Sequence, residues 1–139
     1  LIKAKTKEYV RESQIRFILQ PIIDELTSKL GSYTSIHNQL IAIFSKLKED
    51  LSSQNSYVAG NIINLLINLK INLTGYDFSD LTIRQAYLQG IDLHDVNFSS
   101  CNFINTVFTL KGRRYRLKRR FYKLHSIDTF LIVLSFTGI

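Results

Sequence analysis

Residues 71–108 read INLTGYDFSDLTIRQAYLQGIDLHDVNFSSCNFINTVF, and this stretch decides the fold. Every fifth residue in it is large and apolar: Leu73, Phe78, Ile83, Leu88, Leu93, Phe98, Phe103 and Phe108. A second series lies two positions before each of these and consists of Ile71, Tyr76, Leu81, Ala86, Ile91, Val96, Cys101 and Thr106. A helix has a period of about 3.6 residues and a flat strand a period of about 2, so neither explains a period of five. The pattern predicts a solenoid in which the chain turns a corner in every unit and points both series inward.

The units of this stretch resemble pentapeptide repeats, in which a small residue is followed by Asp or Asn, then Leu or Phe, then two polar residues. The clearest units begin Ile91-Asp92-Leu93, Val96-Asn97-Phe98 and Cys101-Asn102-Phe103. The resemblance implies a right-handed quadrilateral β-helix, in which residues twenty apart stack at about one strand spacing. The expected ladder pairs are Leu73 with Leu93, Phe78 with Phe98, Ile83 with Phe103, and Leu88 with Phe108. Thr82 and Tyr87 stand where Asp or Asn is usual, so the first coil matches less well. The alternative is an ordinary β-meander, which does not require eight apolar positions in phase.

The segment before the repeats predicts helices. Apolar residues recur at helical spacing from Ile15 to Leu30, and the charged stretch before Ile15 is also compatible with a helix. Pro21 falls inside this segment, so the helix either kinks there or a second helix begins at Pro21. Gly31 is the expected end of the helix.

Two further helices are expected closer to the repeats. One extends over about 36–51, with Thr34 or Ser35 as its N-cap, and residues 52–56 form a loop. The other extends over about 58–69 and leads directly into the first repeat. Because the end of a β-helix exposes apolar side chains and unpaired backbone groups, we expect the helix containing Asn61 to Leu66 to cover it.

The fold class is therefore predicted as α+β, with three parts. Residues 1–56 form a helical connector of three to four helices, and residues 57–110 form the capping helix and the β-helix. Residues 111–139 form an irregular tail in which a basic run precedes the apolar segment Phe130–Phe136. The repeat pattern and the family match end near Phe108, and the net charge becomes strongly positive just after it, so we expect this tail to be either translated out of frame or disordered.

The composition narrows the class of protein. The chain has 139 residues, one Cys and a formal net charge of +7. A single Cys excludes an internal disulfide and weakly favours a reducing compartment, so we expect a cytoplasmic protein. Neither a signal peptide nor an apolar run of about 20 residues, as a membrane span requires, is visible. The first residue is Leu, and we expect the sequence to be a piece of a longer protein.

The positive charge is local. Residues 1–110 hold ten basic and ten acidic side chains, so the whole excess lies after Leu110, and residues 111–123 contain eight basic residues. The candidate anion-binding residues are Arg113, Arg114, Arg116, Lys118, Arg119, Arg120 and Lys123. They could neutralise phosphates while neighbouring aromatic side chains stack on bases, which predicts binding to nucleic acid or an anionic surface. A solvated tail explains the same run without any ligand.

No constellation of residues predicts catalysis. His37, His94 and His125 lack companions at the spacing of metal ligands, and Cys101 occupies a small inward slot, so it is expected to be a core thiol. The acidic residues of the repeats do not align in one column, which argues against the DNA mimicry known in some pentapeptide-repeat proteins. We therefore expect no enzyme activity, no cofactor and no metal.

A second resemblance covers about three-quarters of the chain. Its carriers are LIKAKTKEYVRESQIR at 1–16, YVAGNIINLL at 57–66 and LTGYDFSDLTIRQAYLQGIDLHDVNF at 73–98. These segments resemble the region between the nucleotide-binding module and the WD-repeat propeller of bacterial, chiefly cyanobacterial, signalling ATPases of the NB-ARC/NACHT (STAND) type. The ATPase motifs themselves are absent.

This second resemblance implies a non-catalytic connector, a scaffold for protein–protein interaction in signal transduction. Its partners would be a nucleotide-binding module upstream and a propeller downstream in a full-length parent. The alternative function is binding of nucleic acid or an anionic surface through residues 111–123.

Overall fold

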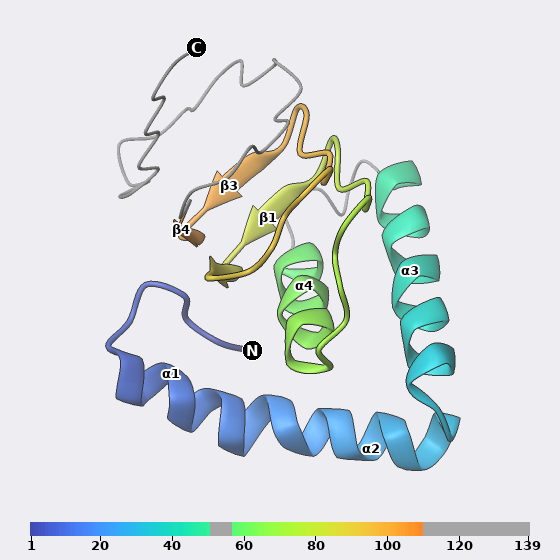
Figure 1. Ribbon diagram of the computed structural model, residues 1–139, viewed down its shortest axis with the longest axis vertical. Coiled ribbons are helices and arrows are strands. Elements are labelled where there is room, and N and C mark those ends of the chain that lie inside the picture. Colours follow the sequence, from blue (N-terminus) through green and yellow to red (C-terminus); the bar gives the residue numbers. More distant parts are fainter. Residues whose placement is uncertain (51–56, 110–139) are drawn as a thin grey trace.

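The computed structural model describes residues 1–50 and 57–109, and these form a mixed α+β fold (Figure 1). The helices are α1 (Glu8–Gln14), a π-helical turn η1 (Ile15–Leu19), α2 (Gln20–Leu30), α3 (Tyr33–Glu49) and α4 (Val58–Asn68). Four short strands follow: β1 (Thr82–Arg84), β2 (Tyr87–Gln89), β3 (Asn102–Ile104) and β4 (Val107–Thr109). None of the helices within the described ranges has the length and apolar character that a membrane crossing requires.

Pro21 lies in the first turn of α2, as the second of the two alternatives predicted, and a π-helical turn joins α2 to α1 without a gap. The backbone N–H of Gln20 donates to the carbonyl of Ile15, an i to i+5 bond, and α2 continues from there with Pro21 in its first turn. Proline lacks an N–H and clashes with the preceding turn, so the widened turn accommodates its ring. The result is one long helical rod along one side of the molecule (Figure 1). Gly31 ends it with φ of +73°, as expected.

Helix α3 begins three residues earlier than predicted. The expected caps Thr34 and Ser35 are wrong, because the side chain of Ser32 accepts the backbone N–H of Ser35 at 3.1 Å. Gly31 already turns the chain in the left-handed conformation, so Ser32 is free to take the extended conformation that an N-cap needs. The buried stripe of α3 then comprises Ile36, Leu40 and Phe44.

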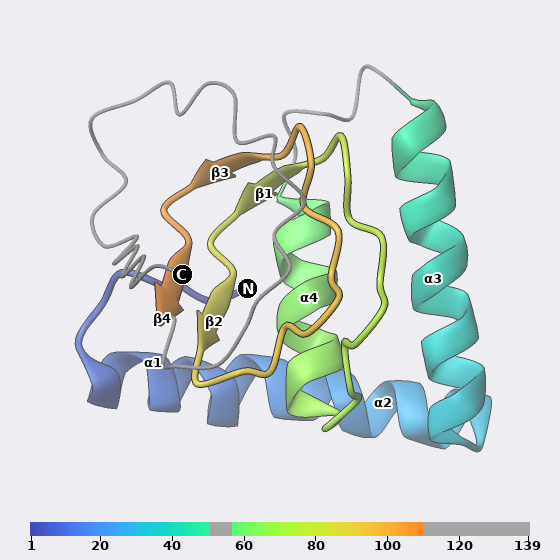
Figure 2. The same ribbon diagram turned by 45° about the horizontal axis from the view of Figure 1, so that its top comes forward.

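The repeats pair in parallel at a register of twenty residues. Ile83 lies opposite Phe103 in the β1–β3 pair, and Leu88 lies opposite Phe108 in the β2–β4 pair. Asp77 and Asn97 form a bridge, and the Phe78 and Phe98 rings stack with centroids 5.6 Å apart. Figure 2 shows β3 beside β1 and β4 beside β2. Three of the four predicted ladder pairs are thereby confirmed.

The pair of Leu73 with Leu93 has no direct contact to test it, but both side chains are buried. The backbone next to it supports the register. The N–H of Gly75 donates to the carbonyl of His94, an offset of 19 residues, and the N–H of Phe78 donates to Asn97 with the same offset.

The two inward series are confirmed by burial. Of the eight predicted ladder residues, seven are buried, and Phe108 is partly buried against the same core. The second series is buried or partly buried throughout the described repeats. Two of its polar members bond to the coil below: the hydroxyl of Thr106 donates to the Ile83 carbonyl at 3.0 Å, and the Cys101 thiol donates to the Phe78 carbonyl.

Every fifth backbone position in the repeats is left-handed. Positive φ angles occur at Lys70, Gly75, Asp80, Gln85, Gly90, Asp95, Ser100 and Asn105, with values from 50° to 79°. Glycine takes this conformation freely at Gly75 and Gly90, and the other six positions hold residues that adopt it at a cost. The left-handed residue is therefore what turns the chain at the end of each unit.

Helix α4 covers the first end of the repeats, as predicted. The Asn64 side chain is almost fully buried, donates to the Gln85 carbonyl at 2.8 Å and accepts the Tyr87 N–H at 2.9 Å. Its amide thus bonds to the backbone edge that has no preceding coil. Gly60 brings the helix close to β1, since a Cβ added there would lie 1.7 Å from the Arg84 carbonyl oxygen.

Residues before α1 pack on the same end of the repeats. Ile2 and Ala4 are buried, and the backbone N–H of Ala4 donates to the Gln85 side chain at 2.8 Å. The guanidinium of Arg11 lies 3.7 Å from the centroid of the Tyr87 ring.

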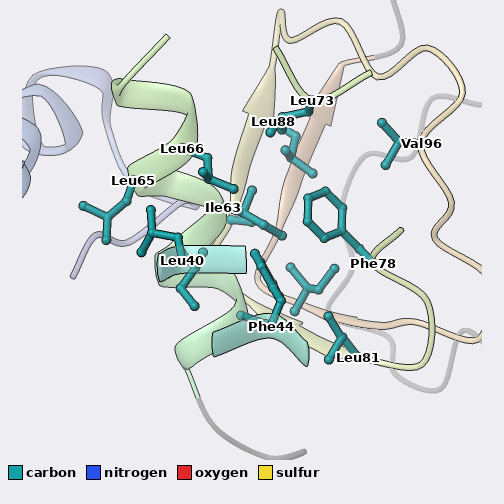
Figure 3. Close-up of a cluster of buried hydrophobic side chains, with 14 of the residues drawn as sticks. Leu40, Phe44, Ile63, Leu65, Leu66, Leu73, Phe78, Leu81, Leu88 and Val96 are labelled. Carbon is teal, nitrogen blue, oxygen red and sulfur yellow. The ribbon is translucent and has the colours of Figure 1, made fainter. Parts of the chain in front are cut away.

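One hydrophobic core joins helices and repeats. It includes Leu19 of η1, Ile36 of α3 and Ile63 of α4, together with the inward residues of the repeats. Figure 3 shows Phe44 and Ile63 directed toward Phe78. The boundary expected near residue 56 therefore separates two sequence patterns that share a core.

Candidate interaction cleft between α3 and the repeats

A cleft of about 410 Å³ lies between α3 and the second repeat unit, residues 76–80. Helix α3 contributes His37, Ile41, Phe44, Ser45 and Lys48, and the repeats contribute Tyr76, Asp77 and Phe78. The residues of α3 recur at intervals of three and four, so the sequence places them on one face of the helix. Figures 1 and 2 show α3 standing beside the repeats, with α4 packed closer to β1.

The floor of the cleft is aromatic. The Phe44 and Phe78 ring centroids are 5.1 Å apart, and those of Tyr76 and Phe78 are 5.5 Å apart. Phe78 in turn stacks on Phe98 of the next coil. These separations are typical of favourable aromatic pairs. The floor is therefore fixed by the ladder of the repeats.

His37 and Tyr76 line the cleft and contact each other. The Tyr76 hydroxyl and the Nε2 atom of His37 form a hydrogen bond, and the two rings meet edge to face with centroids 5.8 Å apart. Burial raises the pKa of Tyr76, so its hydroxyl stays protonated and can donate to the imidazole.

The cleft also carries a charge pair. Lys48 Nζ lies 3.2 Å from Asp77 Oδ1 and donates to the Ser79 hydroxyl at 3.3 Å. Hydrogen bonding from the Ser79 side chain lowers the pKa of Asp77, burial opposes this, and the Ser79 N–H and Lys48 lower it further. Asp77 also accepts from the Asn97 amide at 3.1 Å, which ties the pair to the second coil.

The described residues hold neither a cluster of metal ligands nor an activated thiol. Among residues 1–50 and 57–109, no three His, Cys, Asp or Glu side chains gather as a metal site would require. Desolvation raises the pKa of Cys101 to about 11, so the thiol is protonated at neutral pH and a poor nucleophile.

Of the residues predicted as sites, the structure describes the ladder residues but not the candidate anion-binding residues. Seven of the eight ladder residues belong to the hydrophobic core, and Phe108 packs against it. The seven candidate anion-binding residues between Arg113 and Lys123 lie outside the described residues. Sequence reasoning missed the cleft, because His37 and Tyr76 are 39 positions apart and no local pattern joins them.

Comparison with known proteins agrees with the repeat pattern. The family model of pentapeptide repeats matches residues 71–109 in eight copies. The chain is 50% identical over 109 residues, 78% of its length, to the uncharacterized WD repeat-containing protein alr2800 of Nostoc sp. (strain PCC 7120). It spans only 9% of that relative's length. No solved structure matches the chain. Residues 71–109 are therefore a run of pentapeptide repeats.

Proposed function

We propose that the chain is a non-catalytic connector and protein-interaction module. Its repeats would form a short right-handed quadrilateral β-helix, whose coils hold the surrounding helices in a fixed arrangement. The parallel register of twenty residues and the left-handed corner in every unit support this architecture. The surfaces of α3 and the repeats, with the cleft between them, would contact neighbouring domains.

The shared hydrophobic core is the observation that carries this proposal. Buried residues from η1, α3, α4 and the repeats form one cluster. The Asn64 side chain of α4 also hydrogen-bonds to the backbone of the repeats. A helix that moved relative to the repeats would expose part of this core. A displacement applied at the helices would therefore be transmitted to the repeats, as a connector requires.

The proposed setting is a STAND-type signalling ATPase. The chain would link an upstream nucleotide switch to a downstream WD-repeat sensor in the cytoplasm. The similarity to a short section of a WD repeat-containing protein supports the second half of this setting. The nucleotide-binding half depends on the resemblance of residues 1–16, 57–66 and 73–98.

A chimera tests the connector role. The matching section of the Nostoc relative would be replaced by the corresponding 109 residues of this chain, and in a control by a Gly/Ser linker of equal length. If the chain packs against its neighbours, limited proteolysis should cut the two junctions at least tenfold more slowly than in the linker control. Equal cleavage at the junctions, with the inserted segment itself intact, would refute the proposal.

The concentration of charge in residues 111–123 favours a second candidate function, binding of nucleic acid or an anionic surface. Binding of the full chain to a DNA duplex should then fall steeply with salt, because bound counterions are released. Replacing Arg119 and Arg120 with Ala should reduce the slope of log K against log salt by about 2. No binding at 50 mM salt, or an unchanged slope, would exclude this role.

A further inference from the structure

The second half of the repeats, residues 91–109, ends in an open backbone edge. In the first half, residues 71–90, the N–H groups that donate to carbonyls of the second half belong to Gly75, Phe78, Asp80 and Gln85. The positions twenty residues later are Asp95, Phe98, Ser100 and Asn105, and no described residue accepts from their backbone N–H groups. Three of these four take the same left-handed conformation as their counterparts, so their N–H groups point away from the first half. Such an edge is a template for pairing with another strand.

Three phenylalanine rings form the last layer of the described core at this edge. The ring centroids of Phe103 and Phe108 are 4.8 Å apart, and that of Phe98 lies 5.5 Å from Phe103. In Figure 2, β3 and β4 form the outer side of the repeats, while α4 lies beside β1. Within the described ranges, β3 pairs with β1 alone and β4 with β2 alone. The edge therefore requires a cover that offers both backbone partners and apolar side chains.

We propose that residues 130–136 add to this edge as a further parallel strand beside β3. These residues lie outside the described ranges and read FLIVLSF, without a charge, Gly or Pro. Aromatic and β-branched residues favour strands, and seven residues is an ordinary strand length. Successive side chains of a strand point to opposite faces. One face would then consist of Phe130, Ile132, Leu134 and Phe136. That face would pack on the Phe103 layer, while the strand backbone accepts the Asn105 N–H.

The length and charge of the connection allow this pairing. The described chain ends at Thr109, the last residue of β4, which is itself part of the open edge. Twenty residues, 110–129, separate it from Phe130, and a crossover between parallel strands needs about a dozen or more. Eight basic side chains lie within 111–123, whereas residues 71–109 hold four Asp and one Arg, so opposite charge draws the connection toward the repeats. A tethered segment also acts at an effective concentration of roughly millimolar, which a separate partner must exceed.

Amide hydrogen exchange of the full chain, followed by two-dimensional NMR, tests the added strand. The Asn105 amide should exchange about tenfold more slowly in the parent chain than in Ile132→Asp, which places a charge on the packing face. Ser135→Asp is the matched control, because it places the same charge on the opposite face of the strand and should leave Asn105 protected. The Gln85 amide, which donates to Ile104 within the repeats, reports whether each variant remains folded. Ile132→Ala is a milder second variant and should accelerate Asn105 exchange about threefold.

The concentration dependence of the exchange identifies the occupant of the edge. Protection by the chain's own segment is intramolecular, so dilution should leave it unchanged. Protection that disappears on dilution would assign the edge to a second copy of the chain and overturn the proposal. Rapid exchange of the Asn105 amide in the parent chain, as a tail disordered throughout would give, would also overturn it, as would equal effects of Ile132→Asp and Ser135→Asp. The inference does not depend on the connector role, which the chimera tests separately.

Discussion

Gly60→Ala is the most informative single change in the chain, because two physical effects predict opposite signs. Helix propensity alone predicts that Ala is more stable than Gly at this position, the third residue of α4, by up to about 1 kcal/mol. The packing of α4 predicts the reverse. A Cβ at this position would lie 1.7 Å from the carbonyl oxygen of Arg84 and 2.7 Å from its carbonyl carbon.

The magnitude follows from the displacement that the new methyl group requires. Carbon and oxygen ordinarily approach no closer than about 3.3 Å, so α4 would have to retreat from β1 by roughly 1.6 Å. The obstacle is backbone, which cannot rotate away as a side chain can. Such a movement stretches both hydrogen bonds of Asn64, each worth about 1 kcal/mol, and loosens apolar packing at a cost of about 1–3 kcal/mol. We expect a net loss of about 3 kcal/mol in the free energy of unfolding.

Urea unfolding followed by far-UV circular dichroism measures this loss. Gly75→Ala is the matched control, because its added Cβ meets no atom within 4 Å and only the φ of +79° opposes it. That control should lose about 1–2 kcal/mol. If Gly60→Ala were as stable as the parent chain or more stable, α4 would not be seated on β1 and the account of the cap would be wrong.

Further changes test the cap, the corners and the charge pair. Asn64→Leu leaves the backbone groups that its amide serves without partners and should cost about 3 kcal/mol, whereas Asn68→Leu, at the end of α4, should cost less than half as much in the same urea assay. Ser100→Gly should raise the free energy of unfolding by about 0.5–1 kcal/mol, since an exposed residue at φ of +59° is strained unless it is Gly. The lowered pKa of Asp77 means that its contribution is complete above the carboxyl's ordinary pKa of 3.8 and is lost as pH falls through the lower folded value. Asp77→Asn should therefore flatten the dependence of urea midpoints on pH below about 4, and an unchanged acid slope would contradict this assignment.

The inward residues of the repeats could be predicted because their five-residue spacing determines which side chains face the core. A side chain such as Phe78 has one place in a five-residue unit, and the same place twenty residues later holds Phe98. The covering role of α4 was predictable for a related reason, since the open end of the repeats would expose apolar side chains and unpaired backbone groups. The identity of the cover residue was not, because Asn64 acts through a buried amide that local sequence does not distinguish from a surface one.

Thr82 and Tyr87 stand where the repeat pattern usually has Asp or Asn, and the structure shows the local conformation at these positions. At Asp77 and Asp92, in the second position of their units, the carboxylate accepts the N–H two residues later and forms a local turn, whereas Asn102 in the same position begins β3. Thr82 and Tyr87 cannot form that turn in the same way, and their units become β1 and β2. The weaker first-coil matches thus coincide with the first strands.

The cleft could not be predicted, because it depends on how a helix and a coil meet. Lys48 and Asp77 are unremarkable in their own segments, and only the seating of α3 brings them together. The π-helical turn before Pro21 belongs to the same class of feature. Proline signals a disturbance, and the surrounding packing decides whether the helix breaks or widens.

The regular left-handed corner restricts how this protein can change in length. An insertion or deletion of one residue within 71–109 would move every later corner off its position and turn inward side chains toward water. Only the gain or loss of twenty residues, the offset between the paired strands, leaves the later pairs in register. Insertions and deletions can therefore change the length of the repeat region only in steps of twenty residues.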